Sequence, residues 1–223
     1  MTVLAIDTCA NLCAAALFDP VDGTVLATMT EDLGRGHAER LTSLVGETLA
    51  SAAIAFSDLS RIIVTVGPGS FTGIRVGVSA ARGYGMALGV PVDGITSFAL
   101  LAHGGAAAEG TALVTVAGGR GQVFAQMFAQ REAVGDAMVI QVGDNASASQ
   151  SVPTLLGNGA PLIDPGETCR HVFPDRATGD IDDAFRAFKA GSVAPEPLYL
   201  RAADAKPQTG FALPRASGPK VGA

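Results

Sequence analysis

The first third of the chain alternates short apolar runs with polar turns, a pattern typical of a sheet. Apolar runs at 3–6 and 12–18 are joined by a polar turn and predict a β-hairpin, and a third strand is expected over 24–29. Apolar residues then recur every three or four positions over 37–53, which predicts a helix with one buried face. Residues 62–66 are all apolar or β-branched, as in a strand buried on both faces.

The segment 71–88 predicts the longest helix, and small residues occupy every fourth position along it and just beyond it. These residues are Gly73, Gly77, Ala81, Gly85 and Gly89. Each glycine inside a helix costs about 0.5–1 kcal/mol relative to alanine, so the pattern indicates that another backbone approaches closely. Because bulky apolar residues also lie on this helix, we expect two contact surfaces, one against the protein's own sheet and one against another molecule. The simpler alternative is that the small residues only let the helix sit close to its own sheet.

The rest of the chain predicts a second set of elements in a loosely similar order. We expect strands at 92–95, 112–116, 122–128 and 137–141, helices at 96–103 and 181–190, a strand ending in a glycine turn at 154–159, and an extended segment at 197–201. The stretch 104–110 is expected to connect two lobes, and 144–151 to form a loop. The predicted division is an N-terminal lobe at 1–103, a C-terminal lobe at 104–205 and a loosely held tail at 206–223.

The amino-acid composition limits which classes of protein this chain can belong to. Apolar residues make up 48% of the 223 residues, enough for a buried core, yet no apolar run approaches the roughly 18–20 residues that cross a bilayer. The N-terminal run reaches Asp7 without a basic start, which predicts a first strand rather than a signal peptide.

The three cysteines match no disulfide framework or metal pair, so Cys9 and Cys13 are expected to be buried in a reduced, cytoplasmic protein. The formal charge of −6 argues against binding a nucleic acid backbone alone, and leaves open a role beside a more basic partner.

Two turns invite a nucleotide-binding interpretation. The stretch 67–73 is rich in glycine, but no Lys-Ser/Thr pair follows it, and Thr72 stands where a dinucleotide fingerprint needs its third glycine. A helix N-terminus at this turn could still hold an anion, with Arg75 nearby. Asp7 and Thr8, in the first hairpin turn, could present a carboxylate and backbone amides to a metal-bound phosphate, although such residues are also ordinary in hairpin turns.

Catalytic and metal sites find little support in the sequence. His37, His103 and His171 are each solitary, and no helical histidine pair is present. No local pattern indicates a nucleophile with its general base. We therefore predict no catalytic residue, no metal site and no cofactor.

Four segments, in this order along almost the whole chain, resemble the TsaB (YeaZ) family. They are AIDT at 5–8, VGPGSFTGIR at 66–75, LGNGA at 156–160 and PLYLR at 197–201. The second segment is long and unusual enough to be specific, whereas the others alone are not. The resemblance implies an α/β protein with an actin-like fold of the sugar kinase/Hsp70/actin (ASKHA) type, in which two lobes each contain a mixed sheet with flanking helices.

The function implied by the resemblance is that of a non-catalytic subunit in the machinery that makes N6-threonylcarbamoyladenosine (t6A) in tRNA. Such a subunit pairs with the catalytic paralogue TsaD, the ATPase TsaE joins the pair, and tRNA is reached indirectly through the complex. Relatives make the contact through the two N-lobe helices and self-associate there when the partner is missing, so a homodimer is the alternative assembly. The residues expected at this interface are His37, Leu41, Gly69, Phe71, Thr72, Gly73, Arg75, Gly77, Ala81 and Gly85.

One stretch departs from the family pattern. Family members often carry Asp-Ala-Arg ahead of a Val-Tyr strand in the second lobe, whereas residues 117–121 here are AGGRG. A contact made by that aspartate is therefore not expected in this chain. The rival function is an active ATPase or sugar kinase that uses Asp7 and Thr8, but the second lobe lacks the acidic turn such an enzyme needs. A metallopeptidase is a more distant alternative.

Overall fold

The computed structural model describes residues 1–104, 110–143 and 152–201. The expected loop at 144–151, the tail at 206–223 and most of the predicted connection at 104–110 lie outside the described residues. Within the described part of the chain, no helix combines the length and the apolar character needed to cross a bilayer.

The N-terminal half forms a five-stranded sheet with the strand order β3-β2-β1-β4-β5. Its strands are β1 (Thr2–Asp7), β2 (Leu12–Phe18), β3 (Val25–Asp32), β4 (Leu59–Thr65) and β5 (Val92–Ile95). The predicted hairpin is confirmed, because β1 runs antiparallel to β2, and β1 pairs with β4 in parallel. The strand predicted to be buried on both faces is β4, in which Ile62, Ile63 and Val64 have no exposed area.

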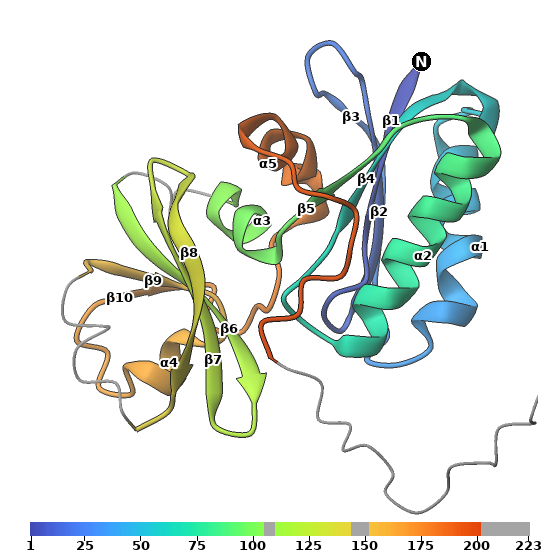
Figure 1. Ribbon diagram of the computed structural model, residues 1–223. Coiled ribbons are helices and arrows are strands. Elements are labelled where there is room, and N and C mark those ends of the chain that lie inside the picture. Colours follow the sequence, from blue (N-terminus) through green and yellow to red (C-terminus); the bar gives the residue numbers. More distant parts are fainter. Residues whose placement is uncertain (105–109, 144–151, 202–223) are drawn as a thin grey trace, which may run out of the picture.

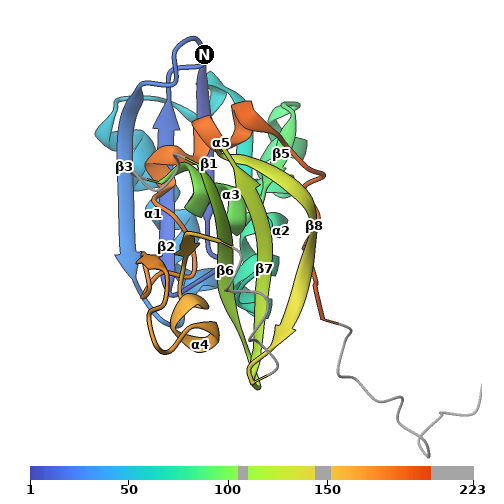
Figure 2. The same ribbon diagram turned by 90° about the vertical axis from the view of Figure 1, so that its left-hand side faces the viewer.

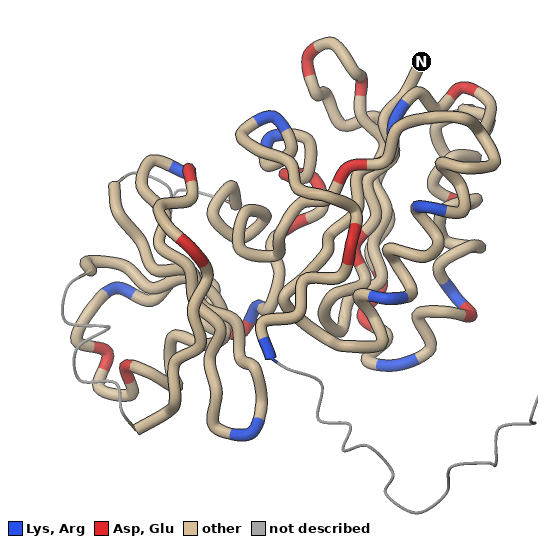
Figure 3. The backbone as a smooth tube through the Cα atoms, viewed as in Figure 1, with Lys and Arg blue, Asp and Glu red and all other residues tan. Residues whose placement is uncertain are grey.

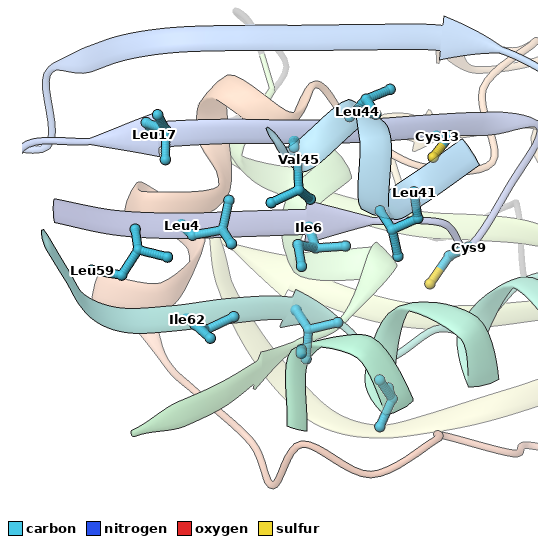
Figure 4. Packing of buried hydrophobic residues seen from close by; sticks show 14 of the residues in the cluster. Leu4, Ile6, Cys9, Cys13, Leu17, Leu41, Leu44, Val45, Leu59 and Ile62 are labelled. Carbon is cyan, nitrogen blue, oxygen red and sulfur yellow. The ribbon is translucent and has the colours of Figure 1, made fainter. Parts of the chain in front are cut away.

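Two helices cover the outer face of this sheet, side by side and away from the second half of the molecule (Figure 1). They are α1 (His37–Ser51) and α2 (Phe71–Leu88), separated by the short 3-10 helix η1 (Phe56–Asp58) and β4. Apolar side chains of α1 pack onto those of the strands, as Figure 4 shows. The labelled side chains from these elements include Leu4, Ile6, Leu17, Leu41, Leu44, Val45 and Ile62. Cys9 and Cys13 belong to the same cluster, as predicted.

The second half repeats the topology of the first. Its strands are β6 (Thr111–Gly119), β7 (Gln122–Ala129), β8 (Glu132–Gln141), β9 (Thr154–Leu156) and β10 (Arg170–Val172). They lie in the order β10-β9-β6-β7-β8, and β6 pairs with β7 antiparallel and with β9 in parallel, as β1 does with β2 and β4. Sequence analysis missed β10 and the helix α4 (Ala160–Ile163), which are three and four residues long. Elements this short contain too few residues to establish a period.

Each half contributes a helix to the sheet of the other half. Helix α3 (Ser97–His103) follows β5, yet its Phe98 and Leu101 pack in the core of the second sheet. Helix α5 (Ala184–Ala190), preceded by the 3-10 helix η3 (Ile181–Asp183), places Phe185 in the core beneath the first sheet. Figures 1 and 2 show both helices between the two sheets. The molecule therefore has the two-lobed, actin-like architecture that the resemblance implied.

Candidate functional site

A cleft of about 580 Å³ separates the ends of the two sheets. From the N-terminal lobe it is lined by the β1–β2 turn at 9–12, by Thr30 and Asp32 of β3 and by the turn at 69–70. From the C-terminal lobe it is lined by 116–117, Asn158 and residues of the segment 175–180. The cleft thus lies where the first strand of each lobe ends.

In each lobe a glycine lies against the backbone of the first strand or of the turn that follows it. In the N-terminal lobe, a Cβ atom on Gly69 would lie 2.1 Å from the carbonyl oxygen of Cys9. In the C-terminal lobe, a Cβ on Gly157 would lie 2.2 Å from the carbonyl oxygen of Thr115, and the φ of Gly157 is +87°. Because no side chain fits at these distances, glycine is required at both turns. The internal repetition, which is not visible as a residue-level repeat, is visible in the strand order and pairing of the two sheets.

Asp7 is enclosed rather than presented to the cleft. Its side chain is 2% exposed, one carboxylate oxygen accepts a hydrogen bond from the Cys9 amide at 2.8 Å, and the other accepts one from the Thr178 hydroxyl at 2.6 Å. Burial raises the pKa of the Asp7 carboxyl above its ordinary value, against the lowering effect of these hydrogen bonds. The contact with Thr178 links the two halves of the chain.

Thr8 is also turned into the protein, because its hydroxyl donates a hydrogen bond to the Gly73 carbonyl at 2.7 Å and the residue has no exposed area. A nucleotide could reach Asp7 and Thr8 only if these internal contacts were broken. Nucleotide binding by the pair stays a prediction.

The end of β6, which corresponds to the end of β1, carries no carboxylate. Its last residues are Ala117, Gly118 and Gly119, and the amide of Ala117 donates to the Asn158 side chain at 2.8 Å. The position from which an actin-like enzyme would present its second acidic group therefore holds only backbone and an amide side chain.

The small residues of α2 face the protein's own sheet. A Cβ on Gly73 would lie 2.0 Å from the Thr8 carbonyl oxygen, and one on Gly85 would lie 2.2 Å from the Val92 side chain. A Cβ on Gly77 would lie 2.5 Å from the Thr8 hydroxyl oxygen, and Ala81 has no exposed area. The close backbone approach that these residues permit is therefore made within the molecule, and their contact with another molecule stays a prediction.

Three more residues of the expected interface also face the protein. Leu41 is 1% exposed in the core, and His37 is 8% exposed, with no hydrogen-bond partner for its Nε2 atom. Gly69 lies against Cys9, as described above. The helix predicted over 37–53 has the expected apolar face, and that face is turned inward.

The remaining expected interface residues lie together at the exposed N-terminus of α2. Phe71 is 53% exposed, and Thr72 and Arg75 are also exposed. The Arg75 guanidinium lies 3.7 Å from the centre of the Phe71 ring, and its Nε donates a hydrogen bond to the Tyr199 hydroxyl at 2.7 Å. The structure thus adds Tyr199, from the distant PLYLR segment, to this group.

An exposed stripe continues along α2 from Arg75. It consists of Arg75, Ser79, Arg82 and Met86, which we call the outer stripe. Met86 is 82% exposed, and α2 contains no acidic residue, so the outer stripe is basic in a chain whose net charge is −6 (Figure 3). Sequence analysis missed Ser79, Arg82 and Met86, although their helical spacing, opposite Ile74, Val78 and Ala81, could have identified them.

His171 is not solitary in three dimensions, contrary to the sequence-based expectation. Its Nε2 atom lies 3.0 Å from a carboxylate oxygen of Asp164, and Cys169 lies beside the same carboxylate. This group lies in the C-terminal lobe, between α4 and β10.

Comparison with known proteins finds a matching family model and several similar proteins. A family model described as TsaD, tRNA N6-adenosine threonylcarbamoyltransferase, matches residues 27–190. An uncharacterised protein of Mycobacterium tuberculosis is 38% identical, over 92% of this chain and 94% of its own length. The tRNA threonylcarbamoyladenosine biosynthesis protein TsaB of Bacillus subtilis is 34% identical, over 57% of this chain and 55% of its own length.

A solved structure from Pseudomonas aeruginosa, described as an uncharacterised protein with similarity to peptidase YeaZ, superposes with a TM-score of 0.74. It is 25% identical, and the superposition covers 90% of this chain and 99% of that chain. The match extends over both lobes.

Proposed function

The chain belongs to the TsaB (YeaZ) family, and from this premise we propose that it is a non-catalytic subunit in the synthesis of t6A in tRNA. It binds a TsaD-type catalytic paralogue and holds that partner in its active form. Burial of a surface on the partner stabilises the assembled state by mass action, without chemistry on this chain.

The observation that carries the proposal is the exposed face formed by α1 and α2. These helices lie on the side of the molecule away from the C-terminal lobe (Figure 1). Tyr199 covers the start of α2 and Phe56 contacts Tyr84, whereas Arg82 and Met86 are exposed. The outer stripe offers an apolar side chain, Met86, and two arginines. Arginine and methionine are enriched in protein–protein interfaces, whereas most charged residues are depleted there. A partner with an acidic or neutral contact surface suits this face.

Two features of the cleft support a non-catalytic role over the rival ATPase or sugar kinase. Both oxygens of Asp7 accept hydrogen bonds inside the protein, and the end of β6 offers no carboxylate. A metal-bound phosphate between the lobes would thus find no free carboxylate at the ends of β1 and β6, and the acidic groups in the cleft lining are Asp32, Asp175 and Asp180 instead. The TsaE-type ATPase, the indirect approach to tRNA and homodimer formation without the partner belong to the same proposal.

The proposal is tested with Met86→Glu and its control Val134→Glu, in which the same charge is placed at a 53% exposed position on β8. We expect Met86→Glu to raise the Kd for the TsaD-type partner at least about tenfold, or about 1.4 kcal/mol, because a charge replaces an apolar contact. Val134→Glu should bind like the wild type. Calorimetry or co-purification measures both, and equal binding by the two variants would show that α2 is not the interface.

Reconstituted tRNA modification tests the function separately. With purified partners and tRNA, omission of this chain should abolish t6A formation, and Met86→Glu should restore it only at raised protein concentration. Full modification without this chain would remove the proposed role, whatever the binding result.

A further inference from the structure

Three side chains that commonly bind metals converge at one point of the C-terminal lobe, outside the cleft and the α1–α2 face. They are Asp164 at the end of α4, Cys169 in the following turn, and His171 in β10. A carboxylate oxygen, the sulfur and a ring nitrogen all lie within 4.8 Å of one another. Asp164 is 4% exposed, and the His171 side chain is 9% exposed.

The simplest explanation for the cluster is a capped turn, which accounts for the contacts of Oδ1 and for the backbone contact of Oδ2 but not for the two side chains beside Oδ2. The Oδ1 atom of Asp164 accepts hydrogen bonds from the amide and the hydroxyl of Thr168, at 3.1 and 2.8 Å, which is ordinary turn chemistry. The Oδ2 atom is approached by three groups: the Cys169 amide at 3.1 Å, the Cys169 thiol at 3.2 Å and the His171 Nε2 at 3.0 Å, which donates only in the tautomer that carries its proton. One carboxylate oxygen has about two lone-pair directions, so it cannot pair well with all three groups.

The distances are close to those of a metal centre. Zinc bonds of about 2.0–2.3 Å in a tetrahedral arrangement separate neighbouring donor atoms by about 3.3–3.6 Å. The sulfur and the nitrogen lie 3.2 and 3.0 Å from Oδ2, so each would move by a few tenths of an ångström to admit the ion. Thr168 already holds the other carboxylate oxygen, which fixes the orientation of the ligand.

We propose that Asp164, Cys169 and His171 form a binding site for a zinc-like divalent transition-metal ion, with water as the fourth ligand. The mixture of sulfur, nitrogen and oxygen donors suits zinc or cobalt and disfavours magnesium and calcium, which prefer oxygen ligands. On binding, the Cys169 thiol loses its proton to solvent and the sulfur bonds to the ion. The thiolate and the carboxylate then balance the two positive charges.

A bound ion would link β10, at the edge of the second sheet, to the end of α4. β10 is the outermost strand next to β9, and only the segment 164–169 connects it to α4. A bond from His171 in the strand and one from Asp164 at the helix end would join these two elements directly. Bound metal is therefore expected to stabilise the C-terminal lobe.

Cobalt titration of the full chain, with any histidine tag removed, tests the site. We expect one equivalent of Co²⁺ to bind, with an intense near-ultraviolet absorption from thiolate-to-cobalt charge transfer. Cys169→Ser should lose this absorption, and the control Cys13→Ala should keep it, because Cys13 lies in the core of the other lobe. Absence of the band in the wild type, or an unchanged band in Cys169→Ser, would overturn the proposal.

A second measurement needs no variant. Cys169 is partly exposed, whereas Cys9 and Cys13 are fully buried, so mild alkylation of the folded protein should label Cys169 first. We expect one equivalent of Zn²⁺ to slow this labelling at least about tenfold and to raise the Tm. An unchanged labelling rate at saturating Zn²⁺ would contradict the site even if the variants failed to fold.

Discussion

At the scale of single residues, Asp7 joins the two lobes through a buried carboxyl group. Burial raises its pKa above the ordinary value of 3.8, and the hydrogen bonds from Thr178 and Cys9 offset part of this rise. A carboxyl group whose pKa is higher in the folded state binds its proton more tightly there. Its contribution to stability is therefore fully present below the unfolded-state pKa and is lost as the pH rises through the raised folded-state pKa.

We predict that Asp7→Asn removes this pH dependence. The amide oxygen can still accept the Cys9 hydrogen bond, and no charge has to be buried at neutral pH. Relative to Asp7→Asn, the wild type should lose stability by up to about 1.4 kcal/mol per pH unit above pH ~4, levelling off beyond the folded-state pKa. Urea unfolding at a series of pH values measures the difference. Parallel pH profiles for the two proteins would show that Asp7 does not titrate differently on folding.

At the scale of elements, the spacing of small residues along α2 correctly indicated a close backbone approach. It did not indicate the side from which the backbone comes. Thr8, at the end of β1, lies against Gly73 and Gly77, and β5 lies against Gly85. The proposed docking surface is on the opposite side of the helix, where the outer stripe lies.

Replacing either of two glycines of α2 with alanine should change the free energy of unfolding, in opposite directions. Gly73→Ala places a Cβ 2.0 Å from a backbone oxygen, so we expect a loss of about 1–3 kcal/mol in the free energy of unfolding. Gly83 has no atom within 4 Å of the added Cβ, so Gly83→Ala should gain about 0.5–1 kcal/mol from helix propensity. Chemical denaturation measures both. Equal effects would mean that α2 does not pack on β1 as described.

At the scale of the whole molecule, the exchange of α3 and α5 makes the lobes depend on each other. The inner face of the first sheet, with Val3 and Phe18, is covered by Phe185 and its neighbours from the other half of the chain. The two sheets are formed by separate parts of the chain, whereas each hydrophobic core combines residues from both halves. Each half alone would expose an apolar sheet face to water.

We therefore predict that a fragment of residues 1–103 does not fold cooperatively by itself, whereas the intact chain unfolds in a single transition. Adding a separately produced fragment of 104–223 should restore structure, because α5 then covers the first sheet. Circular dichroism during denaturation follows each sample. A sharp unfolding transition of the isolated 1–103 fragment would contradict the interdependence of the two cores.

The local pattern of apolar, polar and capping residues predicted much of this fold. The buried strand at 62–66, the helix over 71–88 and the helix following Thr96 depend on neighbours within a few residues, so periodicity and capping revealed them. The phosphate-loop interpretation of 67–73 failed on residue types alone. The segment resemblance indicated the family, and the outward stripe on α2 was also present in the helical spacing.

Contacts between distant residues were decided by the tertiary structure. Asp7 meets Thr178 across 171 positions of sequence, Arg75 meets Tyr199, and α3 and α5 change places between the sheets. His171 meets Asp164 only seven positions away, yet the irregular turn between them has no period from which to predict the contact. A sequence specifies the spacing of side chains along an element, whereas the neighbour each side chain meets depends on how the elements pack. For this chain the sequence alone determined most strands and the principal helices, and packing decided which distant elements each of them meets.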